Sequence, residues 1–329
     1  MKAIGLDSYG GPEVLHPIDL PDRHAGPGEV RIQVSAAAVA PVDSMLRTGL
    51  LSGAYAGLKP PFVPGMEVAG VVDELGEGVE VASELTLGER VVGFVDTGGT
   101  HGGYSDHVVL PAASVTPAPA GSTDAEAASF LNNALTARNA LDALALPANS
   151  TLVVTGAAGS VGGYLTELGA FEGLRVIGIA SAGDEELVRS FGASGFVARG
   201  DDVAERVRAL APEGVDAVAD SALLGDAIVP AIRGGGQIAL FRPWSGRPER
   251  GITACRLNVR QRAQDHAAIT RIRELVEAGV LSLRVATTLP ALDAPEAHRL
   301  LDAGGTRGRI ILEFPVGIDL AGAPATDSE

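Results

Sequence analysis

The sequence predicts an α/β protein with two domains, one built on a doubly wound parallel sheet and the other rich in β structure. Three observations lead to this prediction. The chain has 329 residues, about twice the length of a common domain. Short β segments between Gly and Pro turns fill its first third, which is typical of a barrel-like domain. Beyond residue 122, apolar β segments alternate with helical segments, as in a parallel sheet covered on both faces.

The individual elements follow from the spacing of the apolar residues. In the first domain, strands are expected at 30–34, 67–72, 90–94 and 107–110. A helix over 125–144, with Ser122, Thr123 and Asp124 available as caps, opens the second domain. The strands of the parallel sheet are expected at 151–155, 176–180, 196–198, 215–219 and 237–241. A helix at 267–278, a strand at 283–287, a helix at 294–303, a strand at 309–314 and a frayed acidic tail at 321–329 complete the order.

The charge and the cysteine count exclude several classes of protein. Lys and Arg total 25 against 41 Asp and Glu, and the net charge of −16 at pH 7 repels nucleic acids and anionic membrane surfaces. A single cysteine, Cys255, excludes intrachain disulfides and a Cys-rich zinc lobe. The sequence has neither a signal-peptide pattern nor an apolar run long enough to span a membrane. We therefore expect a cytoplasmic protein with no nucleic-acid or membrane partner.

A glycine-rich turn lies between the strand at 151–155 and a helix that opens near Ser160. Its G-x-x-G-x-x-G spacing is formed by Gly156, Ala157, Ala158, Gly159, Ser160, Val161 and Gly162. Glycines let a diphosphate approach the backbone amides, and the positive end of the helix dipole holds the anion. An ordinary tight turn is the alternative, but the flanking strand and helix favour a dinucleotide site.

Ser181, at the end of the second strand of this sheet, favours NADPH over NADH. An acidic residue there would bind the ribose 2′-hydroxyl of NAD, whereas a small polar residue with a nearby cation suits the 2′-phosphate of NADP. Arg199, at the end of the third strand, is the candidate cation. The acidic run 184–186 would repel a phosphate if it faced the site; otherwise it complements the dipole of the helix that it begins.

Further motifs accompany the glycine turn. They are Ala40-Pro41-Val42-Asp43, Arg47-Thr48-Gly49, the segments 60–72 and 102–107, Phe191-Gly192-Ala193, Gly234-Gly235-Gly236, and the segments 297–301 and 308–312. Taken together, these motifs resemble the zinc-independent quinone oxidoreductase branch of the medium-chain dehydrogenase/reductase superfamily, which includes zeta-crystallin. The resemblance implies a GroES-like catalytic domain of residues 1–122 and 285–329 and a Rossmann dinucleotide-binding domain of residues 123–284. It also implies reduction of quinones and conjugated carbonyls by NADPH, cofactor contacts at Thr136 and Phe241, and a homodimer.

The same resemblance bears on zinc. Zinc-dependent members of the superfamily place Cys, His and Cys where this chain has Ala40, Met66 and Asn132, and their hydroxyl proton relay falls on Val42. We therefore expect no bound metal, which disfavours alcohol oxidation. A quinone or an α,β-unsaturated carbonyl needs less assistance, because its conjugation spreads the developing charge.

The resemblance leaves the proton donor open, because the branch often has Asn where Ala40 stands and Tyr where Met45 stands. Tyr55 is the nearest replacement in sequence, unless it only packs the loop 49–57. Asn132 either bonds a substrate carbonyl or caps a helix turn. Asp43 matches the family motif, and holding its loop through backbone hydrogen bonds is favoured over a catalytic role.

Other reactive residues carry weaker predictions. The six histidines lack metal-ligand spacing, Cys255 is expected to be a filler residue, and Trp244 either walls the substrate pocket or covers the domain junction. The leading hypothesis is an NADPH-dependent, zinc-free reductase of a quinone or enone. The alternatives are a tailoring enoyl reductase of a polyketide-like pathway and a cofactor-binding structural or sensing protein with little turnover.

Overall fold

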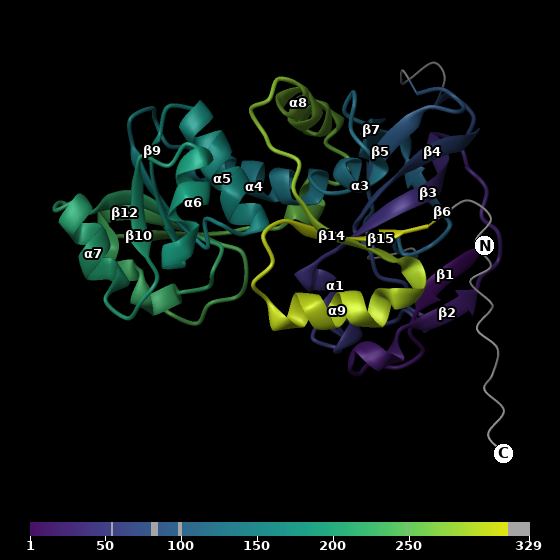
Figure 1. The fold of residues 1–329 in the computed structure, drawn as a ribbon, viewed down its shortest axis with the longest axis horizontal. Helices are drawn as coiled ribbons and strands as arrows, with labels where there is room; N and C mark the ends of the chain where they lie inside the picture. The colour runs from purple at the N-terminus through teal and green to yellow at the C-terminus, as the bar shows by residue number, and fades with distance from the viewer. Residues whose placement is uncertain (54, 80–84, 98–100, 248, 315–329) are drawn as a thin grey trace. The chain divides into compact units, whose positions relative to one another are not determined.

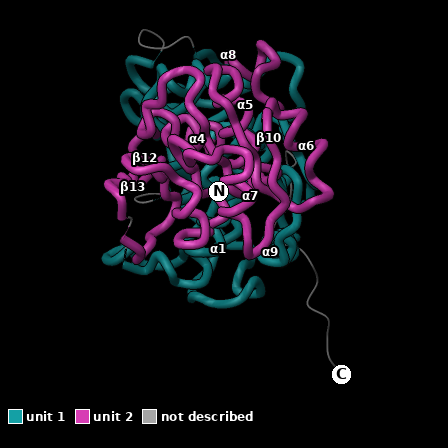
Figure 2. The backbone as a smooth tube through the Cα atoms, turned by 90° about the vertical axis from the view of Figure 1, so that its left-hand side faces the viewer, with its two compact units in different colours: residues 1–131, 263–273, 283–329 teal, residues 132–262, 274–282 magenta. Residues whose placement is uncertain are grey.

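In the computed structural model, the described residues are 1–53, 55–79, 85–97, 101–247 and 249–314. The tail at 321–329, expected to fray, lies outside them. Figure 2 shows the two compact units into which the chain divides. Unit 1 comprises residues 1–131, 263–273 and 283–329, and unit 2 comprises residues 132–262 and 274–282.

Unit 1 is built on a mixed seven-stranded sheet (Figure 1) of order β14-β15-β3-β4-β5-β7, with β6 also paired to β3. The strands are β3 (Glu29–Val39), β4 (Glu67–Leu75), β5 (Arg90–Phe94), β6 (His107–Pro111), β7 (Val115–Pro117), β14 (Val285–Pro290) and β15 (Arg309–Glu313). β14 and β15 are parallel, and the other pairs are antiparallel. Along β3, buried and half-buried side chains alternate until the strand becomes buried on both faces, so one face supplies the core throughout.

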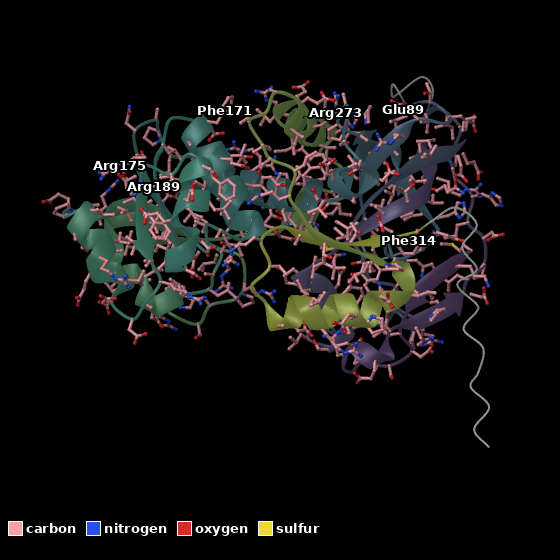
Figure 3. The ribbon with its side chains drawn as sticks, in the orientation of Figure 1. Glu89, Phe171, Arg175, Arg189, Arg273 and Phe314 are labelled. Carbon is pink, nitrogen blue, oxygen red and sulfur yellow. The ribbon has the colours of Figure 1, made fainter. Side chains whose placement is uncertain are left out.

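The remaining elements of unit 1 are β1 (Lys2–Gly5), β2 (His16–Asp19), α1 (Pro41–Arg47), α3 (Asp124–Ala127) and α9 (Ala294–Ala303). β1 and β2 form a separate antiparallel pair. The apolar core gathers side chains such as Ile32, Val68 and Ile310 from the sheet and Ala297 from α9. Phe314, which directly follows β15, is buried in the same core (Figure 3).

Unit 2 is a doubly wound α/β structure on a six-stranded, wholly parallel sheet of order β10-β9-β8-β11-β12-β13. Its strands are β8 (Thr151–Thr155), β9 (Arg175–Ala180), β10 (Gly195–Ala198), β11 (Val215–Asp220), β12 (Ile232–Leu240) and β13 (Thr253–Arg256). Its helices are α4 (Leu131–Leu144), α5 (Ser160–Phe171), α6 (Glu185–Ser190) and α7 (Val203–Leu210), while α8 (His266–Glu277) has residues in both units. The strand order changes direction between β8 and β11, and ligands of such sheets bind at the carboxyl ends of the strands at this point.

The fold class predicted from the sequence is confirmed, and each predicted strand overlaps an observed one. The single helix expected over 125–144 is instead two helices, α3 and α4. The expected cap is present, because the Oγ1 of Thr123 accepts a hydrogen bond from the N–H of Glu126 at 3.2 Å. The short strand β13 was not predicted, since it lies at the sheet edge and its mostly exposed side chains show no apolar alternation.

The units divide the chain near the expected domain boundaries rather than at them. α3 packs against β3, β4, β14 and β15 and therefore belongs to unit 1, so the first boundary lies at 131/132 instead of 122/123. The segment 263–273 also groups with unit 1. Among the described residues, every helix is too short or too polar to cross a membrane.

Candidate active site

The glycine turn follows β8 and leads directly into α5 in unit 2. Gly156 adopts φ +64°, a left-handed conformation that glycine takes without strain. A Cβ on Gly162 would lie 2.1 Å from the carbonyl oxygen of Gly156, so only glycine allows the helix to pack this closely on the turn. The N–H of Ala157 donates to the carbonyl of Ile179 at 3.0 Å, which ties the turn to β9.

The amino end of α5 forms the anion-binding part of this turn. The helix begins at Ser160 and runs for 12 residues, and the amides of its first turn point out of its positive end. Gly159 is the N-cap, in an extended conformation, and a Cβ there would meet only the oxygen of Gly156, at 3.2 Å. The amino end of a helix that follows such a glycine turn suits a diphosphate. The predicted cofactor-binding residues 156–162 all lie in this turn and the start of α5, and their contact with a cofactor stays a prediction.

A hydrogen-bond network at the ends of β8 and β11 holds the turn in place, and the sequence analysis missed it. The Oγ1 of Thr155 donates to Oδ1 of buried Asp220 at 2.7 Å and accepts from the N–H of Ala222 at 2.8 Å. Asp220 also accepts from the N–H groups of Leu224 and Gly225, at 2.9 and 2.8 Å. An acid that directly follows the apolar run 217–219 is the signal that could have revealed it.

Ser181 and Arg199 lie beside each other at the carboxyl ends of two paired strands. Ala180 of β9 pairs with Ala198 of β10, and the N–H of Arg199 donates to the carbonyl of Ala180 at 2.7 Å. The Arg199 side chain is exposed and, within the described residues, has no hydrogen-bond or ion-pair partner. A cation and a small polar residue thus lie together at this sheet edge, and their role in recognising a 2′-phosphate stays a prediction. In the acidic run, Glu185 begins α6 and forms an ion pair at 2.8 Å with Arg189 of the same helix. This position is the one at which an acid complements the helix dipole.

Two further predicted residues lie in the first turns of α4. Asn132 is buried, and its Nδ2 has no hydrogen-bond partner among the described residues. An unsatisfied buried amide is costly, so this group suits a ligand carbonyl. The Oγ1 of Thr136 donates to the backbone carbonyl of Asn132 at 2.7 Å, which keeps the threonine next to it.

Two residues follow the end of β12. Phe241 comes directly after the strand and is half-buried. Trp244 packs on the apolar core of unit 2. A Cβ on Gly225 would lie 2.9 Å from its Nε1, so the indole covers the loop after β11.

In unit 1, buried Asp43 lies in the first turn of α1. Its carboxylate accepts from the N–H of Ala40 at 2.8 Å and from the N–H of Gly65 at 2.9 Å. It also accepts from the hydroxyl of Tyr104 at 3.4 Å. Burial, only partly opposed by these hydrogen bonds, raises the pKa of Asp43 to about 6. These contacts are those of the structural role favoured from the sequence, since they join the segment of Ala40 to that of Gly65.

The network continues through Tyr104, His298 and Arg47, which lie in motifs of the sequence but whose mutual contacts were not predicted. Tyr104 contacts Nε2 of His298 at 3.2 Å, and Nε of Arg47 donates to Nδ1 of His298 at 3.2 Å. Because Nδ1 is an acceptor, the imidazole proton sits on Nε2 and points at the tyrosine oxygen, whose own proton goes to Asp43. Arg47 also contacts Asp302, which accepts from the hydroxyl of Ser44 at 2.8 Å.

Electrostatics keep this network in one protonation state. Burial and the Arg47 charge lower the pKa of His298 to about 4, so the ring is neutral at pH 7. Burial and the Asp43 charge raise the pKa of Tyr104 well above its usual value, so its hydroxyl keeps its proton. Distant motifs at 40–47, 102–107 and 297–301 thus meet in one buried cluster.

Tyr55 lies in the wall of a pocket within unit 1 that has a volume of about 160 Å³. Its side chain is 5% exposed, and its hydroxyl lies 2.5 Å from Oγ1 of Thr97. Its ring packs edge-on against Phe62, with 6.2 Å between the ring centroids. Tyr55 therefore both packs its loop and presents a polar group to a cavity, and its assignment as a proton donor stays a prediction.

The positions expected to lack zinc ligands are buried in unit 1. Ala40 and Met66 are each 4% exposed, and neither an alanine nor a thioether is a suitable zinc ligand. Glu67, next to Met66, forms a buried ion pair with Arg309 at 3.7 Å. In the part of the chain that the structure describes, no group of three or more His, Cys, Asp or Glu side chains is placed to hold a metal ion. These residues do not fit a catalytic zinc.

Cys255 lies on β13 and is half-buried, and burial raises the pKa of its thiol. A raised pKa disfavours the thiolate and hence nucleophilic chemistry. This environment agrees with the filler role expected from the sequence.

A β-rich unit followed by a doubly wound unit with a glycine turn defines a class, the two-domain dehydrogenases. Residues 26–120 match the family model described as the alcohol dehydrogenase GroES-like domain, and residues 191–312 match that of the zinc-binding dehydrogenases. A solved mycobacterial quinone oxidoreductase is 30% identical, with a TM-score of 0.79 over 95% of this chain and 99% of that one. The chain belongs to the medium-chain dehydrogenase/reductase superfamily and is related to its quinone oxidoreductases.

Other relatives broaden this picture. A mycobacterial protein solved in complex with NADPH is 29% identical, with a TM-score of 0.83 over 95% of this chain and all of that one. The pikromycin polyketide synthase component PikAII of Streptomyces venezuelae is 31% identical over 95% of this chain, which matches 8% of that protein. The rat synaptic vesicle membrane protein VAT-1 homolog is 33% identical over 67% of this chain, and the match spans 53% of its length. The chain thus spans about half the length of the vertebrate relatives that it matches.

Proposed function

We propose that this protein is an NADPH-dependent, zinc-free oxidoreductase that reduces a quinone or an α,β-unsaturated carbonyl compound. The observation that carries the proposal is a glycine turn at the amino end of α5, in a chain whose zinc positions hold Ala40 and Met66. A conjugated acceptor spreads the developing negative charge itself and needs no Lewis acid. The similarity to a mycobacterial quinone oxidoreductase and to an NADPH complex supports the same function.

Bound NADPH would supply a hydride to the β-carbon of an enone, a proton would add to the α-carbon, and NADP⁺ would remain. In unit 2, the first amides of α5 would bind the diphosphate, because they point out of the positive end of the helix. Arg199, with Ser181 beside it, would bind the 2′-phosphate. The unpaired Nδ2 of Asn132 would donate a hydrogen bond to a ligand carbonyl.

In unit 1, two side chains would act in different ways. Tyr55 would donate a hydrogen bond or a proton from the pocket wall, where its hydroxyl lies next to Thr97. Asp43 would act as a positioning residue, because its carboxylate joins the backbones of Ala40 and Gly65. Its neighbour Tyr104 is held by the same network and keeps its proton.

The test follows NADPH oxidation at the nicotinamide absorbance band, with 1,4-naphthoquinone and with small enones as acceptors. We expect turnover that survives exhaustive dialysis against a metal chelator. Turnover that disappears with the chelator and returns with zinc would contradict the zinc-free part of the proposal. Tight NADPH binding without turnover of any acceptor would favour a binding or sensing role.

A second candidate, an enoyl reductase of carrier-bound thioesters, is favoured by the similarity to PikAII, which extends over 95% of this chain. Such an enzyme would use the same hydride transfer, with an α,β-unsaturated thioester as the acceptor in place of an enone. The discriminating measurement is kcat/KM for crotonyl-pantetheine against that for 1,4-naphthoquinone. A much higher value for the thioester would assign the enoyl reductase.

A further inference from the structure

The pocket beside Tyr55 combines an apolar wall with basic side chains. Leu46 of α1 and the neighbouring Phe62 and Val63 line its apolar part. Arg23, Lys59 and His101 line it as well, although they are far apart in the sequence. None of the described residues that line this pocket is acidic. This is unusual in a chain whose net charge is −16.

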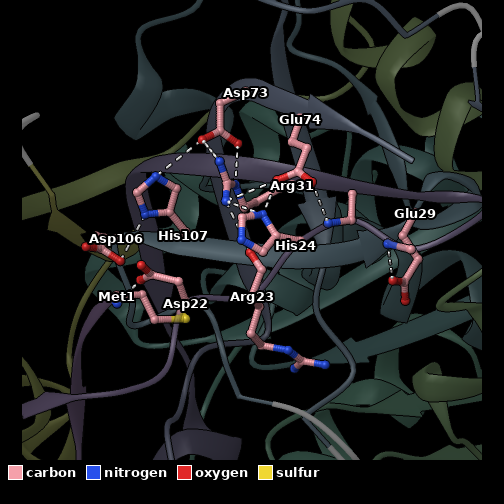
Figure 4. A network of polar contacts seen from close by, with 12 residues as sticks. Met1, Asp22, Arg23, His24, Glu29, Arg31, Asp73, Glu74, Asp106 and His107 are labelled. Carbon is pink, nitrogen blue, oxygen red and sulfur yellow. Dashed lines mark hydrogen bonds and ion pairs between the residues drawn. The ribbon is translucent and has the colours of Figure 1, made fainter. Parts of the chain in front are cut away.

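The two permanent cations of the pocket are not neutralised. Within the described residues, the side chains of Arg23 and Lys59 have no hydrogen-bond or ion-pair partner. Figure 4 shows that the Arg23 guanidinium points away from the carboxylates of Asp73 and Glu74, which are engaged by Arg31. The Arg23 side chain thus forms no ion pair with these carboxylates, and it lines the pocket instead.

The pKa of His101 is affected by Arg23. Burial and, after it, the charge of Arg23 lower the pKa of His101. The guanidinium is therefore near enough to act on the ring electrostatically. Because its pKa is lowered from 6.5, the imidazole adds no further positive charge to the pocket near pH 7.

These observations bear on the acceptor. In a protein of net charge −16, long-range repulsion slows the approach of an anion. Unpaired cations beside one apolar pocket counteract this repulsion locally and favour an anionic ligand. A guanidinium binds carboxylate or phosphate oxygens in a bidentate manner, and an ammonium adds a point charge. The apolar wall suits an unsaturated hydrocarbon body.

The following inference rests on the proposed function. We propose that the acceptor carries an anionic group, a carboxylate or a phosphate. Arg23 and Lys59 bind this group, while the unsaturated body of the acceptor packs on Phe62 and Val63. The specificity of the enzyme is then for anionic enones or quinones rather than neutral ones.

The test measures binding by calorimetry at low ionic strength, so that it does not depend on turnover. Two matched pairs of probes are used: cinnamate with cinnamamide, and crotonyl-4′-phosphopantetheine with crotonyl-pantetheine. We expect the anionic member of at least one pair to bind about tenfold more tightly than the neutral one. A preference in the first pair identifies a carboxylate site, and a preference in the second a phosphate site. No preference in either pair overturns the proposal.

Variants then locate the site. The double variant Arg23→Gln/Lys59→Gln should lose the preference for the anion, whereas Arg299→Gln, which removes an exposed charge paired with Glu296, should keep it. A preference that survives in the double variant would also overturn the proposal. NADPH oxidation with neutral 1,4-naphthoquinone, measured on the wild-type protein and on Arg299→Gln, tests the proposed function separately, and Arg299→Gln should change it less than twofold.

Discussion

The buried pair of Asp43 and His298 should make the stability of unit 1 respond to pH in two opposite directions. The pKa of His298 is lowered from 6.5 to about 4 in the folded protein. The unfolded chain therefore binds more protons between these values, and stability is lost as the pH falls. The pKa of Asp43 is raised from 3.8 to about 6. There the folded chain binds more protons, and stability is gained as the pH falls.

The size of each effect follows from these pKa values. Between pH 7.5 and pH 5.5, protonation of the unfolded histidine costs the folded state about 1.3 kcal/mol. Over the same interval, protonation of the folded Asp43 contributes about 0.8 kcal/mol in the opposite sense. The two effects partly cancel in the wild-type protein and leave about 0.5 kcal/mol, so single variants are needed to separate them.

The assay is urea unfolding followed by far-ultraviolet circular dichroism at both pH values, above the pI of 4.8. His298→Asn should be destabilised at pH 7.5 because it loses contacts with Arg47 and Tyr104. Its deficit relative to wild type should shrink by about 1.3 kcal/mol at pH 5.5. The deficit of Asp43→Asn should instead grow by about 0.8 kcal/mol.

A non-titrating core variant, Thr116→Val, serves as the control, and its difference from wild type should not depend on pH. The fluorescence of Trp244, which packs in unit 2, reports that unit separately. The reasoning would be refuted if the deficits of His298→Asn and Asp43→Asn moved in the same direction with pH, or if neither moved more than that of the control.

Three further outcomes test other parts of the molecule. Gly162→Ala places a Cβ 2.1 Å from a backbone oxygen and should cost about 1–3 kcal/mol of stability, with loss of NADPH binding by calorimetry. Gly234→Ala, near the amino end of β12, places a Cβ at an ordinary contact distance of 3.7 Å from the oxygen of Arg250 and should change neither. Arg199→Ala should raise the Kd for NADPH at least tenfold and leave the Kd for NADH within twofold. Arg175→Ala, at the opposite end of β9, should alter neither Kd. Equal effects of Arg199→Ala on both cofactors would contradict the role assigned to Arg199. Thr116→Val removes a buried hydroxyl that has no partner among the described residues, so urea unfolding should show a stabilisation of about 1 kcal/mol, and a marked loss of stability would indicate a missed partner.

The network around His298 explains why several family motifs belong together. Asp43, Tyr104 and His298 each stand in a different motif of the sequence. In the structure they form one hydrogen-bonded chain with a single proton arrangement. A change in any member leaves another buried polar group unpaired, which costs more than the hydrogen bond itself contributes.

The sequence by itself determined the architecture and the nucleotide turn. Local patterns suffice for these, because strand and helix periodicity, the glycine spacing and the Thr123 cap act over a few residues. The proximity of Ser181 and Arg199 also follows, since the ends of neighbouring parallel strands share one sheet edge. The absence of suitable zinc ligands at Ala40 and Met66 follows from residue type and from the resemblance to the family.

Only the tertiary structure decided which distant side chains meet. Periodicity does not show that His298 of α9 reaches Tyr104, or that Arg23, Lys59 and His101 line one pocket. Those contacts depend on strand register and on loop paths. The antiparallel pairing of β15 with β3, for example, brings residues 310–313 alongside residues 36–39. A polar residue in a loop looks the same in sequence whether it is solvated or buried, because its partner is chosen by packing far along the chain.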